Sequence, residues 1–161
     1  GILQGLKKAS GNFLGWTHAD MQTDPHDVVR AYEVIRAKNF AQNLFIKGSR
    51  RKRSWFDQFF TLGMSCFELV YMHKFLWDIN GQPNIFHRSF FKQWENPPHD
   101  FALDLYALYM AKMSKLNVIR FSVYFPERVY GTSSWNTGLG GKVKLIRRTM
   151  SFSRSLKKGL R

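Results

Sequence analysis

A short apolar segment followed closely by polar side chains places the strongest constraint on the fold. Residues 13–16 are apolar, and the polar residues after them are His18, Asp20, Gln22 and Asp24. This order is typical of a buried strand whose carboxyl end carries site residues in a loop. Because alternate residues of an extended segment point the same way, His18, Asp20 and Gln22 can converge on one cation. The same pattern also suits an ordinary loop in which Asp24 caps the next helix.

The spacing of apolar residues predicts alternating helices and strands in the first third of the chain. We expect a helix over 2–9, a strand over 13–17, a helix over 25–38 and a strand over 44–46. The apolar spacing of the second helix comes from Val28, Val29, Tyr32, Val34 and Ile35. A strand, a helix and a strand at this spacing predict a βαβ unit and a parallel sheet.

The middle of the chain combines a basic loop with an aromatic-rich helix. Residues 47–53 include Arg50, Arg51 and Arg53, and 55–77 has the pattern of one long helix that is too interrupted to span a membrane. Two interpretations remain for this helix: it lies at a membrane interface, or it is buried in a core or subunit contact. The basic run is also typical of nucleic-acid binding, but the nearby aromatic residues have core-like helical spacing.

The last third predicts a helix over 100–115 and a strand over 118–125. Phe101, Leu105, Leu108 and Met113 are the expected buried positions of that helix, and Asp104 lies within its apolar face. A buried carboxylate needs a partner, so Asp104 is either a structural hydrogen-bonding centre or a site residue.

The charge of the chain indicates a polyanionic partner. The 161 residues carry a formal net charge of +14, and the tail over 137–161 is basic with an apolar helical stripe. Such a tail suits an anionic membrane surface, although it also suits a surface helix packed on the domain. The single cysteine, Cys66, cannot form an intrachain disulfide, which fits a reducing compartment.

Four segments together resemble dolichol-phosphate mannose synthases and related polyprenyl-phosphate enzymes of glycosyltransferase family 2. GLKKASGN (5–12) followed by HADMQ (18–22) resembles the family segment "GLKxAxGD…DADLQ". The resemblance implies that Asp20 and Gln22 bind a divalent metal and the diphosphate of a nucleotide sugar. His18 stands where the family has Asp and would be a third ligand, which suits Mn²⁺ better than Mg²⁺.

The other three segments follow in the family's order. Asp78, Gly81 and Arg88 match a "DxxSGF" loop and the basic residue after it, which implies that Asp78 is the acceptor-side acid; a turn-forming aspartate is the ordinary alternative. Residues 100–104 resemble the family's "fxfD" helix. Residues 128–135 resemble an "RxxGxSK" loop, which implies that Arg128 and Ser133 hold phosphate groups; a glycine turn with a surface arginine is the alternative.

The resemblance implies an α/β protein of the GT-A fold, with a mostly parallel sheet flanked by helices. Residues 1–135 would form part of the catalytic domain, without its first strands and nucleobase pocket, and 136–161 a basic amphipathic tail helix. The implied activity is inverting hexosyl transfer from a nucleotide sugar to polyprenyl phosphate or another glycan acceptor, with Mg²⁺ or Mn²⁺. The basic residues of the middle loop, Arg50, Arg51 and Arg53, would hold the acceptor or lipid phosphate.

The implied location is the cytoplasmic face of a membrane, to which the chain binds peripherally, in cell-envelope polysaccharide biosynthesis. Nucleic acid is not an expected partner. The competing hypothesis is a non-catalytic basic module that binds an anionic membrane or nucleic acid.

Overall fold

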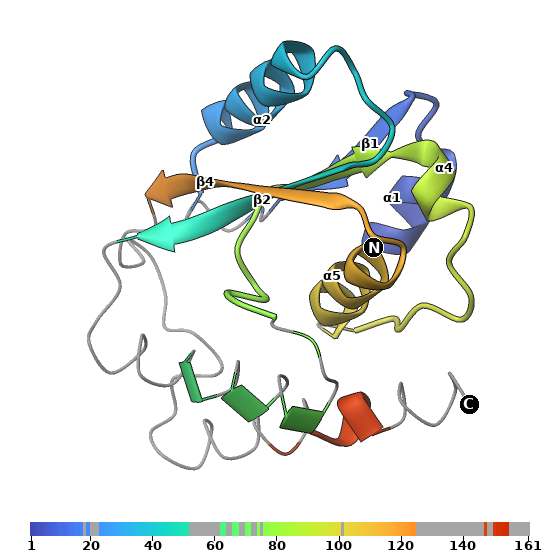
Figure 1. Ribbon diagram of the computed structural model, residues 1–161. Coiled ribbons are helices and arrows are strands. Elements are labelled where there is room, and N and C mark those ends of the chain that lie inside the picture. The colour runs from blue at the N-terminus through green and yellow to red at the C-terminus, as the bar shows by residue number, and fades with distance from the viewer. Residues whose placement is uncertain are drawn as a thin grey trace. The chain divides into compact units, whose positions relative to one another are not determined.

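The computed structural model describes most of the chain (Figure 1). The described residues are 1–17, 19, 23–51, 62–63, 66–67, 70–71, 74, 76–100, 102–124, 147 and 150–154. The chain divides into two compact units. The first contains Gly1–Arg53 and Asp78–Pro126, and the second contains Ser54–Trp77 and Glu127–Arg161. The predicted boundary at 135 and 136 lies outside the described residues.

The first unit is an α/β structure with a four-stranded sheet. Its helices are α1 (Ile2–Lys8), α2 (His26–Ala37), α4 (Arg88–Phe91) and α5 (Leu103–Met113). Its strands are β1 (Phe13–Trp16), β2 (Leu44–Arg51), β3 (Asn84–His87) and β4 (Asn117–Tyr124). The predicted elements α1, β1, α2, β2, α5 and β4 are all present, and most of their bounds differ from the prediction by one to three residues. The sequence also predicts a short strand at 85–86 and a short helix at 89–94, where β3 and α4 lie.

The sheet is mixed, so the prediction of a mostly parallel sheet was wrong. The strand order is β1-β3-β2-β4, with β3 antiparallel to both β1 and β2 and with β2 parallel to β4. The strands β1 and β2 do run in the same direction, but β3 lies between them. The strand β2 ends at Arg51, and the chain returns at Asp78, which binds Arg50, so β3 starts from the end of the sheet at which β2 stops. A strand that starts at the end of the sheet where β2 stops, and that pairs with β2, must be antiparallel to it.

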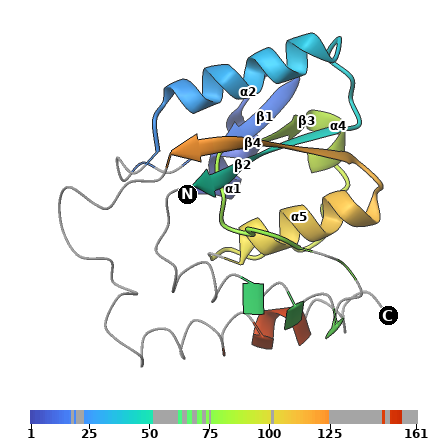
Figure 2. The ribbon, with the colours of Figure 1, turned by 60° about the vertical axis from the view of Figure 1, so that its left-hand side comes forward.

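The two faces of the sheet are covered by different helices (Figures 1 and 2). The helix α2 packs on one face, where its Ala31 and Ile35 join a core with Leu44, Ile46 and Ile85. The helix α5 lies on the opposite face. There an aromatic cluster is built from Trp16, Phe45, Phe86, Phe90, Trp94 and Tyr106.

Asp24 lies just before α2, but the N-cap of this helix is Pro25 and not Asp24, which one interpretation of the segment had predicted. The Oδ1 atom of Asp24 accepts a hydrogen bond of 2.8 Å from the backbone N–H of His26. The buried face of α2 was predicted in part: Ile35 is buried and Val34 packs against the core, whereas Val29 and Tyr32 are about half exposed. On α5, Leu105 and Leu108 are buried as predicted, whereas Met113 is exposed near the helix end.

The strand β2 is longer than the predicted 44–46, and this changes the position of its basic residues. All eight residues of β2 pair with β4, from Leu44 opposite Asn117 to Arg51 opposite Tyr124. The backbone of residues 47–51 therefore has strand partners. The prediction that these residues form a loop was wrong.

The second unit is described at scattered positions. Residues 62–63, 66–67, 70–71, 147 and 150–154 are helical, whereas Leu76 and Trp77 are not, so the predicted helix does not extend to Trp77. The side chains of Leu62 and Val70 are 46% and 77% exposed. Among the described residues, no helix has both the length and the apolar character that crossing a membrane requires.

Candidate functional site

Three parts of the chain meet at the edge of the sheet where β1, β2 and β4 end. Trp16 and Lys47 both lie opposite Asn84, the first residue of β3. The segment 78–83 therefore enters β3 at the edge where β1 and β2 leave the sheet. Asp104, in the first turn of α5, binds Trp16 and Asn84. We call this place the carboxyl edge; carboxyl ends of strands are the usual location of sites in α/β folds.

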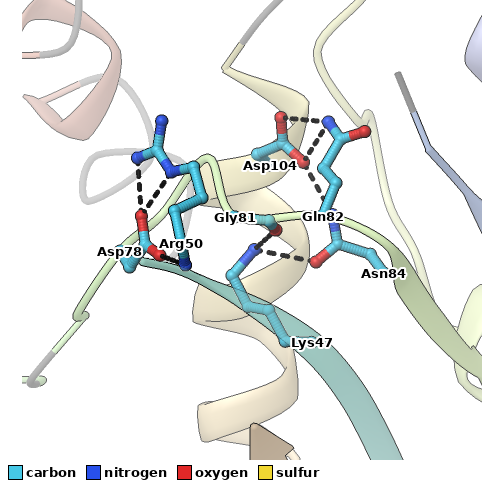
Figure 3. Close-up of polar contacts among 7 residues, drawn as sticks. All are labelled: Lys47, Arg50, Asp78, Gly81, Gln82, Asn84 and Asp104. Carbon is cyan, nitrogen blue, oxygen red and sulfur yellow. Dashed lines mark hydrogen bonds and ion pairs between the residues drawn. The ribbon is translucent and has the colours of Figure 1, made fainter. Parts of the chain in front are cut away.

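Asp104 is a buried hydrogen-bonding centre at the carboxyl edge. Its Oδ1 accepts hydrogen bonds from Trp16 Nε1 at 3.1 Å and Asn84 Nδ2 at 2.8 Å. Gln82 Nε2 donates to both carboxylate oxygens at 3.3 and 3.4 Å (Figure 3). A buried carboxylate requires such donors. Asp104 therefore joins the end of β1 to the segment before β3.

Lys47 lies next to this group and is fully buried (Figure 3). Its Nζ donates hydrogen bonds to Gly81 O at 2.7 Å and to Asn84 Oδ1 at 2.8 Å. The same Asn84 amide donates to Asp104, so one side chain connects the amine with the carboxylate. Burial lowers the pKa of Lys47 to about 7, although the negative charge of Asp104 acts in the opposite direction.

Asp78 and Arg50 form a buried ion pair beside Lys47. Asp78 Oδ1 accepts from Arg50 Nε at 2.8 Å, and its Oδ2 accepts from the Arg50 backbone N–H at 2.8 Å. The side chains are only 12% exposed for Arg50 and 4% for Asp78. Burial alone would raise the pKa of Asp78, but the charge and hydrogen bonds of Arg50 outweigh it and hold the pKa below its ordinary value.

Arg120 adds a further positive charge from β4, directly opposite Lys47 in the sheet. Burial lowers the pKa of Arg120, and the negative charge of Asp78 partly offsets this effect. An arginine keeps its charge at any ordinary pH. The carboxyl edge thus holds the fixed charges of Arg50 and Arg120 around an amine that titrates near neutrality.

Most of the predicted site residues lie outside the described part of the chain. These are His18, Asp20, Gln22, Arg53, Arg128 and Ser133. The two residues that flank the predicted metal segment are described, and their hydroxyl oxygens, Thr17 Oγ1 and Thr23 Oγ1, lie 3.2 Å apart. The chain therefore leaves β1 and returns to the same point. Arg51 is described and lies at the end of β2.

No metal-binding group of three or more His, Cys, Asp or Glu side chains occurs among the residues that the structure describes. The predicted ligands fall outside them. Their donor set, an imidazole nitrogen from His18, a carboxylate from Asp20 and an amide oxygen from Gln22, suits Mn²⁺ better than Mg²⁺.

Sequence reasoning missed the polar residues that hold the carboxyl edge together. Lys47 was assigned to a basic loop, and Gln82, Asn84 and Trp16 received no role. The sequence carried no clear signal for the longer strand, because residues 44–46 form an apolar run and the residues after them are polar or glycine.

Comparison with protein-family models finds no match for this chain, and a search of curated proteins finds none either.

Proposed function

We propose that the carboxyl edge is the donor site of an inverting glycosyltransferase. The enzyme transfers a hexosyl group from a nucleotide sugar to an acceptor, which we take to be a polyprenyl phosphate at a membrane surface. The observation that carries this proposal is the meeting of three segments at one edge. These are the end of β1, the Asp78–Gly81 turn and the start of α5. The turn and the start of α5 belong to segments that resemble glycosyltransferase family 2, and β1 lies between the two matched stretches, 5–12 and 18–22.

The charges at this edge suit the proposed chemistry. Transfer from a nucleotide sugar produces a diphosphate leaving group, and positive charge aimed at that group stabilises the transition state. Arg50 and Arg51 lie at the end of β2, where they would hold phosphate oxygens. A divalent cation held by His18, Asp20 and Gln22 would neutralise the leaving diphosphate.

Asp78 has a role that follows from its ion pair. A carboxylate with a lowered pKa is a weak base, so it is poorly suited to removing a proton from a hydroxyl. A phosphate acceptor is already an anion at neutral pH and needs no strong base. In this proposal, Asp78 orients the guanidinium of Arg50, and Arg50 contacts the anion.

The test is a transfer assay with nucleotide sugars and polyprenyl phosphate in the presence of Mn²⁺. Asp20→Ala removes a proposed metal ligand, and transfer should fall by about 100-fold or more, as is typical for loss of a group that stabilises transition-state charge. Asp24→Ala is the matched control, because Asp24 lies in the same loop, is not a proposed metal ligand, and accepts a hydrogen bond from the backbone N–H of His26. Full transfer activity in Asp20→Ala would overturn the proposal.

A non-catalytic module that binds an anionic membrane is the second candidate. It is supported by the exposed apolar side chains of Leu62 and Val70, which are on helical residues, and by the net charge of +14. Deletion of 137–161 should weaken binding to anionic liposomes and reduce its dependence on salt. This candidate gains support if the protein binds anionic liposomes but binds no nucleotide under any condition. If deletion of 137–161 leaves liposome binding unchanged, the tail has no role in it.

A further inference from the structure

The amine of Lys47 can keep both of its hydrogen bonds whether it is neutral or protonated. In the part of the chain that the structure describes, its acceptors are Gly81 O and Asn84 Oδ1. A neutral amine has two N–H bonds and can donate to both, whereas an ammonium group has a third N–H. Gaining or losing a proton therefore does not require either hydrogen bond to break.

Among the residues that the structure describes, the charged groups that act on Lys47 carry charges that cancel when Lys47 is neutral. Asp104 faces it from α5, Asp78 from the segment before β3, Arg120 from β4 and Arg50 from its own strand. The residue of β1 at this level of the sheet, Trp16, is uncharged. These two carboxylates and two guanidinium groups, which are the described charges around the amine, sum to zero, and protonation of Lys47 adds one positive charge to them. With a pKa of about 7, both states of Lys47 are populated at neutral pH.

We propose that binding of a nucleotide-sugar diphosphate at the carboxyl edge is coupled to the uptake of a proton by Lys47. This inference rests on the proposed function, because it takes the diphosphate to bind there. A bound divalent cation would add positive charge that disfavours protonated Lys47, and a diphosphate with two negative charges would offset the charge of that cation, so Lys47 gains a proton from the buffer when the diphosphate binds. Direct contact is not needed, since charge–charge interactions away from water fall only inversely with distance.

The test is calorimetry of nucleotide-sugar binding to the metal-loaded protein, in pairs of buffers with different ionisation enthalpies. A nucleotide sugar is the right probe because its diphosphate is a diester, with no group that titrates near neutral pH. At pH 8, where Lys47 starts mostly neutral, the enthalpy should differ between buffers by an amount that corresponds to uptake of up to about one proton. At pH 5.5, where Lys47 is already protonated, Lys47 should take up none.

Two variants locate the proton. Lys47→Met removes the titrating group and should abolish uptake at pH 8, whereas Lys112→Met, on the exposed end of α5, should leave it unchanged. If Lys47→Met does not fold, the wild-type comparison of pH 8 with pH 5.5 still decides. Binding at pH 8 with the same enthalpy in every buffer overturns the inference and leaves the donor site standing. Failure of every nucleotide sugar to bind at either pH contradicts the proposed function itself.

Discussion

The amine of Lys47 has no contact with water, and its pKa near 7 links the stability of the protein to pH. The folded-state pKa of about 7 lies below the ordinary value of 10.5 that applies in the unfolded chain. Between these two pH values the unfolded chain binds more protons than the folded one, so the free energy of unfolding rises with pH. Below about pH 7 this contribution becomes constant.

We therefore expect the free energy of unfolding to depend on pH through Lys47. Between pH 7 and pH 9, Lys47 should add up to about 1.4 kcal/mol per pH unit to the slope of the wild-type protein. Urea unfolding at several pH values measures this slope in the wild type and in Lys47→Met, which should lose the added part. Lys112→Met should keep the wild-type slope. Identical slopes in wild type and Lys47→Met would show that Lys47 does not titrate in this range.

The ion pair of Asp78 and Arg50 gives a second prediction for single residues. Asp78→Asn leaves the guanidinium of Arg50 buried without its counter-charge, which should cost about 3–5 kcal/mol of stability. Glu33→Gln is the control, because Glu33 pairs with Arg36 on an exposed helix surface and its loss should cost less than about 1 kcal/mol. Chemical unfolding at pH 7 compares them, and equal costs for the two variants would contradict the account.

The pH dependence of this ion pair has the same sign as that of Lys47 but lies in the acid range, because the folded-state pKa of each group is lowered. Because the folded-state pKa of Asp78 is lowered, its contribution to stability is present above the unfolded-state pKa and is lost as the pH falls through the folded-state value. The loss begins in the acid range, below the ordinary pKa of an aspartate. The residue that the sequence marked as a site acid is thus also part of the acid stability of the fold.

At the scale of elements, the segment that leads into β3 lies directly on β2. The N–H of Gly48 donates to Pro83 O at 2.9 Å, and a Cβ on Gly48 would collide with the backbone of Gln82. A Cβ on Gly81 would likewise collide with the backbone carbonyl of Gly48. Two glycines therefore allow the backbones to approach closely enough for Lys47 to reach Gly81.

This approach predicts that a single methyl group at Gly48 disrupts the carboxyl edge. Gly48→Ala should destabilise the protein by about 1–3 kcal/mol, because the segment of Gln82 must move away. Gly5→Ala is the matched control: Gly5 lies in α1 with open space around it, and alanine there should stabilise the helix by about 0.5–1 kcal/mol. Thermal unfolding separates the two, and a neutral Gly48→Ala would mean that the segment does not need this contact.

The elements were predictable from the sequence because their signals are local. Apolar spacing identified α2 and α5, and alternation identified β4. The insertion of β3 between β1 and β2 was not predictable in this way, because strand order depends on where a segment returns to the sheet. At that return Asp78 contacts Arg50, a residue far from it in sequence.

The candidate site was predictable to a lesser degree. Asp104 was expected to be buried with hydrogen-bonding partners, and this is confirmed. The partners themselves, Trp16 and Asn84, come from other strands and carry no motif that would identify them. The roles predicted for Asp20, Gln22 and Arg128 stay predictions, since these residues lie outside the described part of the chain.

At the scale of the whole molecule, the two units offer different chemistry. The first unit contains the sheet and the charged carboxyl edge, and the second contributes exposed apolar side chains on helical residues. The net charge of +14 makes association with any polyanion favourable at low salt, so binding alone does not identify a site. A site is identified by selectivity among polyanions and by dependence on a metal.

The central claim is that this chain holds a metal-dependent site for a nucleotide diphosphate at the carboxyl edge. The most direct measurement is calorimetric titration of nucleoside diphosphates and nucleotide sugars at physiological salt, with and without Mn²⁺, into the wild-type protein and Asp20→Ala. The account predicts that one nucleotide base is preferred, that binding requires Mn²⁺, and that Asp20→Ala abolishes it. Equal, metal-independent binding of all nucleotides, or no binding of any, would contradict the claim.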